Sequence, residues 1–242
     1  MGTLKTWATA VVLVVLAGTA QAGLVNRNGG MIYDTTRNIT WLADMNYAKT
    51  SGYTGNDVLV DGRMRWNAAT AWADNLVYGG FDDWRLPTLN TSFDKTCSDT
   101  YDSGMFTQYY GTGCTGGELS GLFVTDLGNK ANESVLNQVG DTAEQKANLA
   151  LFSNVKAYYY WSGTQASFGL ASNYAWDFNS FGGIQDYASK NVEFYAVAVR
   201  PGDVTTSVPP GDGPPSVPEP QTLALALLAL GAAAVVSRRR SR

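Results

Sequence analysis

The prolines of this 242-residue chain are distributed very unevenly: seven of the eight lie between positions 201 and 220, and only Pro87 lies elsewhere. Proline fixes its own φ and has no backbone N–H to donate, so the stretch 201–216, which includes SVPPGDGPPS, suits neither a helix nor a sheet ladder. We therefore expect the folded domain to cover residues 23–200 and an extended linker to follow over 201–216.

The first 22 residues have the pattern of a secretory signal peptide. Lys5 precedes an apolar run over 8–17, and Ala20 and Ala22 form an A-x-A cleavage site. The alternative is a buried N-terminal helix, but the spacing of the cleavage site favours the signal peptide. We predict that signal peptidase cuts after Ala22 and that Gly23 is the first residue of the mature protein.

A second apolar run lies near the other end of the chain. Residues 223–236 carry no charge, and a basic cluster of Arg238, Arg239, Arg240 and Arg242 follows. As a helix the run spans about 21 Å, which is short for a hydrocarbon core of roughly 30 Å, although arginines that reach the headgroups extend it. The position of the arginines predicts a cytoplasmic end. We expect transient insertion into the membrane, with the folded domain facing outward.

Four residues directly precede this run: Val217, Pro218, Glu219 and Pro220. A Pro-Glu-Pro motif, a short apolar helix and a terminal arginine cluster, in this order, resemble a PEP-CTERM sorting signal over residues 217–242. The resemblance implies processing by exosortase, a membrane enzyme of Gram-negative bacteria, and export to the cell surface or extracellular matrix. The alternative is a plain C-terminal anchor.

Composition excludes several classes of function. The sequence has no histidine, so it lacks the commonest general base and the commonest transition-metal ligand. Residues 23–218 contain 12 basic and 20 acidic side chains, a net charge of −8. An acidic domain does not suit the phosphate backbone, so we expect no nucleic-acid partner. We also expect no catalytic residue, no cofactor and no metal.

The patterns within residues 23–200 predict a mixed α+β domain. Residue 67 is a predicted N-cap and the glycines at 79–80 a predicted stop for the clearest helix. The last predicted strand has apolar side chains on both faces, which is typical of a strand buried on both sides. We predict strands over 31–34, 39–42, 157–162, 174–178 and 193–199, helices over 67–78, 118–127 and 143–151, and a loop over 90–117.

Several short motifs lie along this pattern. They are Ile32-Tyr33-Asp34, Thr40-Trp41, Trp66-Asn67-Ala68-Ala69, Asp83-Trp84-Arg85-Leu86-Pro87-Thr88, Glu118-Leu119, Tyr160-Trp161-Ser162-Gly163-Thr164 and Val199-Arg200-Pro201. Together they resemble the Lcl C-terminal domain, a family of unknown function. The resemblance implies a C-type-lectin-like α+β architecture, as in formylglycine-generating enzymes, with twisted antiparallel sheets and two main helices. The cysteine-containing loop departs from the family pattern.

Cys97 and Cys114 are the only cysteines and share one Gly-rich loop. In an exported protein such a pair predicts a disulfide, which stabilises a loop of this size by about 3 kcal/mol in the chain-entropy model. A copper-binding pair, as in formylglycine-generating enzymes, is the alternative. Asp94, Asp99 and Asp102 lie in the same loop, where we weigh a calcium site against solvated acids and favour the latter.

Two further groups of side chains invite a functional interpretation. Asp82, Asp83 and Arg85 are ionisable neighbours, but we favour a structural role, with Arg85 in a partly buried ion pair. Tyr158 and Tyr160 lie on one face of an aromatic strand and are the candidate ligand surface, because a tyrosine ring with a polar edge suits a sugar. The alternative is plain packing of the aromatic rings in the core.

The sequence thus predicts an exported, non-enzymatic protein that binds, or takes part in, an extracellular polysaccharide or biofilm matrix. The alternatives are an extracellular enzyme on a formylglycine-generating-enzyme-like fold and a scaffold that binds only other proteins.

Overall fold

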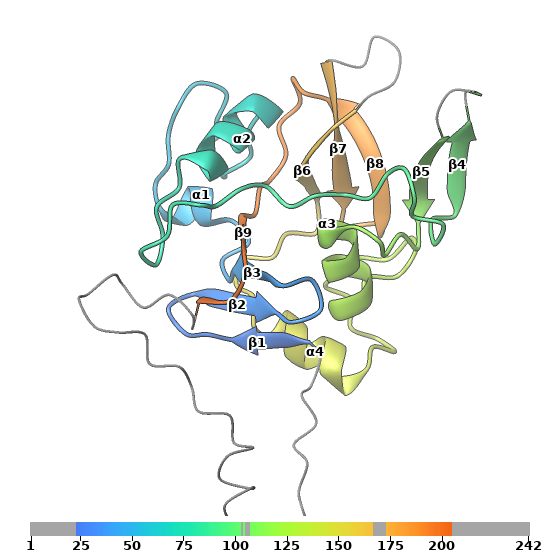
Figure 1. The fold of residues 1–242 in the computed structure, drawn as a ribbon, viewed down its shortest axis with the longest axis horizontal. Helices are drawn as coiled ribbons and strands as arrows, with labels where there is room; N and C mark the ends of the chain where they lie inside the picture. The colour runs from blue at the N-terminus through green and yellow to red at the C-terminus, as the bar shows by residue number, and fades with distance from the viewer. Residues whose placement is uncertain (1–22, 103, 105–106, 167–172, 205–242) are drawn as a thin grey trace, which may run out of the picture. The chain divides into compact units, whose positions relative to one another are not determined.

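The computed structural model describes residues 23–102, 104, 107–166 and 173–204 (Figure 1). The chain divides into two compact units, Met1–Thr206 and Ser207–Arg242, and all of the described residues belong to the first. Within them, no helix has the length and apolar character needed to cross a membrane. The predicted signal helix and the predicted apolar C-terminal helix both lie outside the described residues.

The first sheet has four antiparallel strands in the order β1-β2-β3-β9 (Figure 1). They are β1 (Leu24–Asn26), β2 (Met31–Asp34), β3 (Ile39–Leu42) and β9 (Val199–Pro201). Strands β2 and β3 confirm the prediction for 31–34 and 39–42. All four residues of β3 are buried, because β3 lies between β2 and β9.

The second sheet has five antiparallel strands in the order β4-β5-β8-β7-β6. They are β4 (Asp99–Asp102), β5 (Thr107–Thr112), β6 (Tyr159–Gln165), β7 (Tyr174–Asn179) and β8 (Ile184–Ser189). Strands β6 and β7 match the predictions for 157–162 and 174–178. The expectation of a loop over 90–117 is wrong in part, since β4 and β5 form a hairpin there.

The helices are short. They are α1 (Tyr47–Thr50), α2 (Trp66–Asp74), α3 (Glu118–Gly121), the π-helix η1 (Leu122–Asp126) and α4 (Ala143–Leu149). The helix predicted over 118–127 is confirmed, although its second half has π geometry. Helix α4 confirms the prediction for 143–151 and begins at a capping box, in which the hydroxyl oxygen of Thr142 accepts from the backbone N–H of Gln145.

Helix α2 corrects two details of the prediction. It begins one residue earlier than expected, so Arg65 and not Asn67 holds the N-cap position, and no side chain caps the helix. It ends at Asp74, before the expected stop at Gly79 and Gly80. These glycines instead have φ values of 63° and 84°, which glycine adopts without steric cost, and form the turn that follows the helix.

The continuous strand predicted over 193–199 is also wrong. Phe194 bridges to Met64, and Tyr195 bridges in parallel to Tyr160, before Val199 enters β9. The segment therefore pairs with four different partners, since Val199 pairs with both Trp41 and Arg85, and cannot keep one regular ladder. Its predicted burial on both faces is nevertheless found, since Ala196, Val197 and Ala198 are at most 1% exposed in the structure.

The five-stranded sheet is packed on both faces. Tyr160, Trp176 and Phe178 join one buried cluster with Phe123 of η1. The neighbouring residues Trp161 and Ala175 point the other way and join a second cluster with Trp72 of α2. Side chains alternate between the faces of a strand, so β6 and β7 divide the core between these two clusters.

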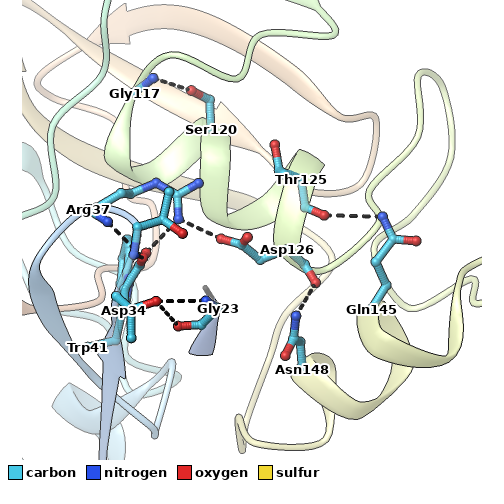
Figure 2. A network of polar contacts seen from close by, with 12 residues as sticks. Gly23, Asp34, Arg37, Trp41, Gly117, Ser120, Thr125, Asp126, Gln145 and Asn148 are labelled. Atoms are coloured by element: carbon cyan, nitrogen blue, oxygen red, sulfur yellow. Dashed lines mark hydrogen bonds and ion pairs between the residues drawn. The ribbon is translucent and has the colours of Figure 1, made fainter. Parts of the chain in front are cut away.

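A polar network joins the β2–β3 hairpin to the helices (Figure 2). The Arg37 guanidinium donates to Asp34 at 2.5 Å and to Asp126 of η1 at 2.6 Å. Asp34 also accepts from the backbone N–H of Arg37 at 3.0 Å, which holds the hairpin turn. The side chains of Gln145 and Asn148 of α4 donate to backbone carbonyls at the end of η1, both at 3.1 Å. The hairpin, η1 and α4 are therefore held together by directional contacts.

Candidate ligand-binding site

A surface depression of about 380 Å³, which we call the Tyr158 depression, lies beside strand β6, where three segments that are distant in the sequence meet. Its lining comprises Asp61, Arg63, Lys156, Ala157, Tyr158 and Tyr195.

Backbone pairing at the segment 194–195 brings the lining residues together. The backbone groups of Phe194 and Met64 exchange two hydrogen bonds, of 2.8 and 3.0 Å, which places Arg63 beside this segment. On the other side, Tyr195 donates to the Tyr159 carbonyl at 3.0 Å, and Trp161 donates to the Tyr195 carbonyl at 2.9 Å.

The turn that carries Asp61 and Arg63 depends on a glycine. Gly62 has a φ of 92°, a conformation that L side chains rarely adopt. A Cβ at this position would also overlap with the Asn46 side chain and approach Lys49 Cβ to 2.9 Å. Asn46 in turn donates to the Asp61 carbonyl at 3.0 Å. The turn is thus fixed against the end of α1.

Two hydroxyl groups hold the backbone of residues 156–158 in place. The Tyr160 hydroxyl accepts from the Lys156 backbone N–H at 2.8 Å, and the Ser180 hydroxyl accepts from the Tyr158 backbone N–H at 3.1 Å. The expectation that Tyr160 belongs to a ligand surface is therefore wrong: its ring is 0% exposed, and burial raises its pKa. Only Tyr158 of the predicted pair reaches the surface, where it is half-buried.

Arg63 is positioned by two groups of the depression. Its guanidinium donates to Asp61 at 2.8 Å and to the Tyr158 hydroxyl at 3.4 Å, and lies 5.3 Å from the centre of the Tyr158 ring. Burial acts to raise the pKa of Asp61, but hydrogen bonds from the backbone and side chain of Arg63 outweigh it and lower that pKa. Asp61 is therefore a carboxylate at neutral pH.

Two family models match parts of this sequence. A family model for the Lcl C-terminal domain matches residues 30–200. The chain belongs to the Lcl C-terminal domain family. A model for the PEP-CTERM protein-sorting motif matches residues 216–240, so this Lcl C-terminal domain protein is exported to the cell envelope and processed by exosortase. No curated protein and no solved structure matches the chain.

The cysteines of this Lcl C-terminal domain form the predicted disulfide, which links Cys97 to Cys114. A carboxylate oxygen of Asp94 lies within 4.8 Å of both sulfur atoms, but the disulfide leaves no thiolate to bind a metal. Asp94 instead accepts from the Gly116 backbone N–H at 2.7 Å. Asp99 accepts from the Ser98 hydroxyl, and Asp102 accepts from the backbone N–H of Gly104. Among the described residues, these three acids do not form one cluster that could hold a metal ion.

The ionisable group before Pro87 has a structural role. Arg85 donates two hydrogen bonds of 2.7 Å to the carboxylate of Glu118, which confirms the predicted ion pair. Asp83 accepts from Arg200 at 2.7 and 3.0 Å. Both contacts tie this stretch to other elements, Arg85 to α3 and Asp83 to β9.

The predicted processing sites lie mostly outside the described residues. These are Ala20, Ala22, the motif Val217-Pro218-Glu219-Pro220 and the arginines 238–240 and 242. Gly23 is described and lies directly before β1, where its N–H donates to the Thr35 hydroxyl at 2.7 Å. Cleavage after Ala22 remains a prediction.

Sequence reasoning identified Tyr158 but missed Asp61, Arg63, Lys156 and Tyr195. Their positions along the chain follow no common spacing, because the depression is built by pairing between segments far apart in the sequence. The single local signal is the motif Asp61-Gly62-Arg63, in which a glycine turn places two opposite charges next to each other.

Proposed function

We propose that this exported protein is a non-enzymatic binding protein of the cell surface or the extracellular matrix, and that the Tyr158 depression binds exopolysaccharide. In this proposal the Lcl C-terminal domain has a C-type-lectin-like architecture. The antiparallel sheets and the few short helices support this part of the proposal. The apolar run over 223–236 holds the protein in the inner membrane until exosortase acts on the tail.

The observation that carries the proposal is the placement of Tyr158 and Tyr195 with polar groups around them. A sugar ring has apolar faces and a rim of hydroxyl groups, so it suits an aromatic surface with hydrogen-bonding groups at its edge. The two tyrosine rings lie 6.0 Å apart between centroids. Arg63, Asp61 and Lys156 line the same depression and supply donors and acceptors for hydroxyl groups.

The chemistry of the lining favours binding over turnover. Most glycosidases need two carboxyl groups on opposite sides of the scissile bond, one of them an acid with a raised pKa. The depression has one carboxylate, Asp61, and the pKa of this group is lowered. The whole sequence also lacks histidine. These features favour a binding module over a glycosidase.

A glycan array with the native exported protein tests the proposal. We expect selective retention of a polysaccharide from the producing cell, without shortening of its chains. Tyr158→Ala should abolish retention, whereas Tyr53→Ala, at a tyrosine that is 37% exposed and outside the depression, should leave it unchanged. Shortened chains would point instead to an enzyme, and failure to retain any glycan would leave the protein-binding scaffold.

The tail is tested by intact mass in cells with and without exosortase. We expect a species that begins at Gly23 and ends near Pro220, found only when exosortase is present. An unprocessed tail in both strains would mean that 223–236 and the following arginines are a permanent anchor, and the matrix role would lose its main support.

A further inference from the structure

Gly23, the residue after the predicted signal cleavage point, lies beside the polar network around Arg37 (Figure 2). It stands opposite Thr35 at the start of β1. Its N–H donates to the Thr35 hydroxyl at 2.7 Å, and its carbonyl accepts from the Thr35 backbone N–H at 3.1 Å. The next pair of the ladder is Leu24 with Asp34. Gly23 is therefore held against the hairpin turn that carries Asp34 and Arg37.

Acidic side chains outnumber basic ones around Gly23. Asp34 and Asp126 share the Arg37 guanidinium, at 2.5 and 2.6 Å. Glu144, in the first turn of α4, is a third carboxylate, since a Cβ on Gly23 would lie 3.6 Å from its Oε1. Glu144 forms no ion pair with any part of the chain that the structure describes. Three carboxylates therefore surround one guanidinium, a net charge of −2.

The excess of negative charge acts on Asp126. Burial raises the pKa of this carboxyl and Arg37 lowers it, but the charges of Asp34 and Glu144 raise it again, so that it lies above its ordinary value. A cation within about 4–6 Å favours the ionised form of a carboxyl group. A second cation at this place would therefore stabilise the carboxylates that share Arg37.

Signal peptidase creates a cation at this position. Hydrolysis of the bond between Ala22 and Gly23 consumes one water: the Ala22 carbonyl carbon gains the hydroxyl, and the Gly23 nitrogen becomes an amine. In an unfolded chain such an amine has a pKa of about 7.7–8.0, so it is largely an ammonium ion at pH 7. The nitrogen is bonded to the same Cα as a Cβ would be, which places Oε1 of Glu144 within about 6 Å of it.

We propose that removal of the signal peptide completes this network: the α-ammonium group of Gly23 becomes its second cation, keeps the hydrogen bond to Thr35 and pairs with Glu144. In the precursor the same nitrogen belongs to a neutral amide, whose single N–H is already donated to Thr35. The ion pair joins β1 to α4 and exists only after export. The domain is therefore more stable in the mature protein than in the precursor.

The ion pair should depend on pH in a defined way. Glu144 raises the pKa of the amine in the folded protein above its value in the unfolded chain. The stabilisation is then complete below about pH 7.7 and is lost as pH rises through the raised pKa. The other charged groups around Gly23 are the carboxyl groups of Asp34 and Asp126 and the Arg37 guanidinium, whose ordinary pKa values lie outside the range of roughly pH 7–10.

Thermal melting of the native exported protein at pH 7 and pH 10 tests the pair. Glu144→Gln should lower Tm by about 1–4 °C at pH 7, as expected for one partly exposed ion pair, and by less at pH 10. A carboxylate in the first turn also stabilises α4 at both pH values, so the difference between the two losses reports the ammonium. Glu133→Gln is the matched control, at an exposed carboxylate that accepts only from Asn137 among the described residues. Its effect should be the same at both pH values.

Chemical removal of the amine identifies its partner. Transamination with pyridoxal phosphate converts an N-terminal amine to a neutral carbonyl and leaves lysine side chains intact. At pH 7 it should lower the Tm of the parent and of Glu133→Gln by similar amounts, and it should leave that of Glu144→Gln unchanged because the pair is already absent.

Three results would overturn the proposal. They are a mature protein whose intact mass does not begin at Gly23, a parent whose Tm is unchanged by transamination, and equal losses on transamination in the parent and in Glu144→Gln. Ligand binding plays no part in these measurements, so their outcome is independent of the proposed function.

Discussion

Asp177 and Asp186 face each other directly across strands β7 and β8. Asp177 is 1% exposed, and its Oδ1 has no hydrogen-bond partner among the described residues. Burial, with a smaller contribution from Asp186, raises the pKa of Asp177 well above its ordinary value. Like charges in directly opposed strand positions destabilise a sheet, so this pair costs the domain stability whenever both carboxyl groups are ionised.

The pair predicts a specific pH dependence of stability. Because the pKa of Asp177 is raised in the folded protein, the folded state binds the proton more tightly than the unfolded state does. The contribution of protonated Asp177 to stability is greatest below the pKa that an aspartate has in the unfolded chain, about 3.9. It is lost as pH rises through the pKa of Asp177 in the folded protein. We expect Asp177→Asn to be more stable than the parent at pH 8 by about 1–3 kcal/mol and close to it at pH 4.

Urea denaturation between pH 4 and 8 measures this difference. Asp102→Asn is the matched control, because Asp102 is exposed on β4 and its removal changes the net charge equally. A variant Asp177→Asn that is less stable than the parent at pH 8 would mean that the buried carboxylate has a favourable partner in the folded protein.

The Arg85–Glu118 pair gives the opposite pH dependence. Burial acts to raise the pKa of Glu118, but the hydrogen bonds from Arg85 and from the Thr88 backbone N–H outweigh it and lower that pKa. The contribution of Glu118 to stability is therefore present above its unfolded pKa, about 4.3, and lost as pH falls through the folded value.

Arg85→Lys should destabilise the domain by about 1–2 kcal/mol at pH 7, a range set below that of buried charged hydrogen bonds because Arg85 is partly exposed. Lysine cannot make the two parallel contacts of a guanidinium. Thermal melting at pH 7 and pH 3 tests this, since the difference from the parent should shrink at pH 3. Arg65→Lys is the control, at a more exposed ion pair. Equal effects of the two substitutions would contradict a special role for Arg85.

The sequence predicted the elements whose apolar pattern agrees with their surroundings. Strands β2 and β3 and the helix α2 belong to this class. Strand β8 was missed because a buried position is polar: Gln185 is 0% exposed and donates to the Tyr109 carbonyl at 2.9 Å. A hydrophobic pattern does not reveal a buried polar position whose side chain is held by long-range hydrogen bonds to the β5 backbone and the cysteine loop.

The candidate site was predictable only in part for a related reason. Tyr158 stands out in a run of aromatic residues, but the burial of Tyr160 depends on the cluster around Phe123, which no local pattern shows. Arg63 and Tyr195 approach Tyr158 only because Phe194 bridges to Met64 and Tyr195 bridges to Tyr160. Such irregular bridges have no repeating signature in the sequence.

The disulfide should contribute measurably to stability, because it closes a long loop around the β4–β5 hairpin. We expect the double substitution Cys97→Ser/Cys114→Ser to lower the free energy of unfolding by about 3 kcal/mol. Urea denaturation measures the loss, and a reducing agent should reproduce it in the parent but not in the variant. Two free thiols in the denatured, unreduced exported protein would contradict the bond.

Gly121 lies against the Arg37 network and is not in a turn. Gly121 has a helical φ of −63°, where alanine normally stabilises by roughly 0.5–1 kcal/mol. Here a Cβ would overlap with the Arg37 guanidinium and lie 2.8 Å from the Thr115 carbonyl oxygen. Arg37 would have to leave Asp34 and Asp126, so Gly121→Ala should destabilise the domain by about 1–3 kcal/mol.

Gly55→Ala is the control for this substitution, because its Cβ would meet nothing closer than Val58 at 3.8 Å. It should change the free energy of unfolding by less than about 1 kcal/mol, as measured by urea denaturation under the same conditions. If Gly121→Ala were as stable as the parent, Arg37 would be free to move without loss. The network that joins the β2–β3 hairpin to η1 would then contribute little to the stability of the fold.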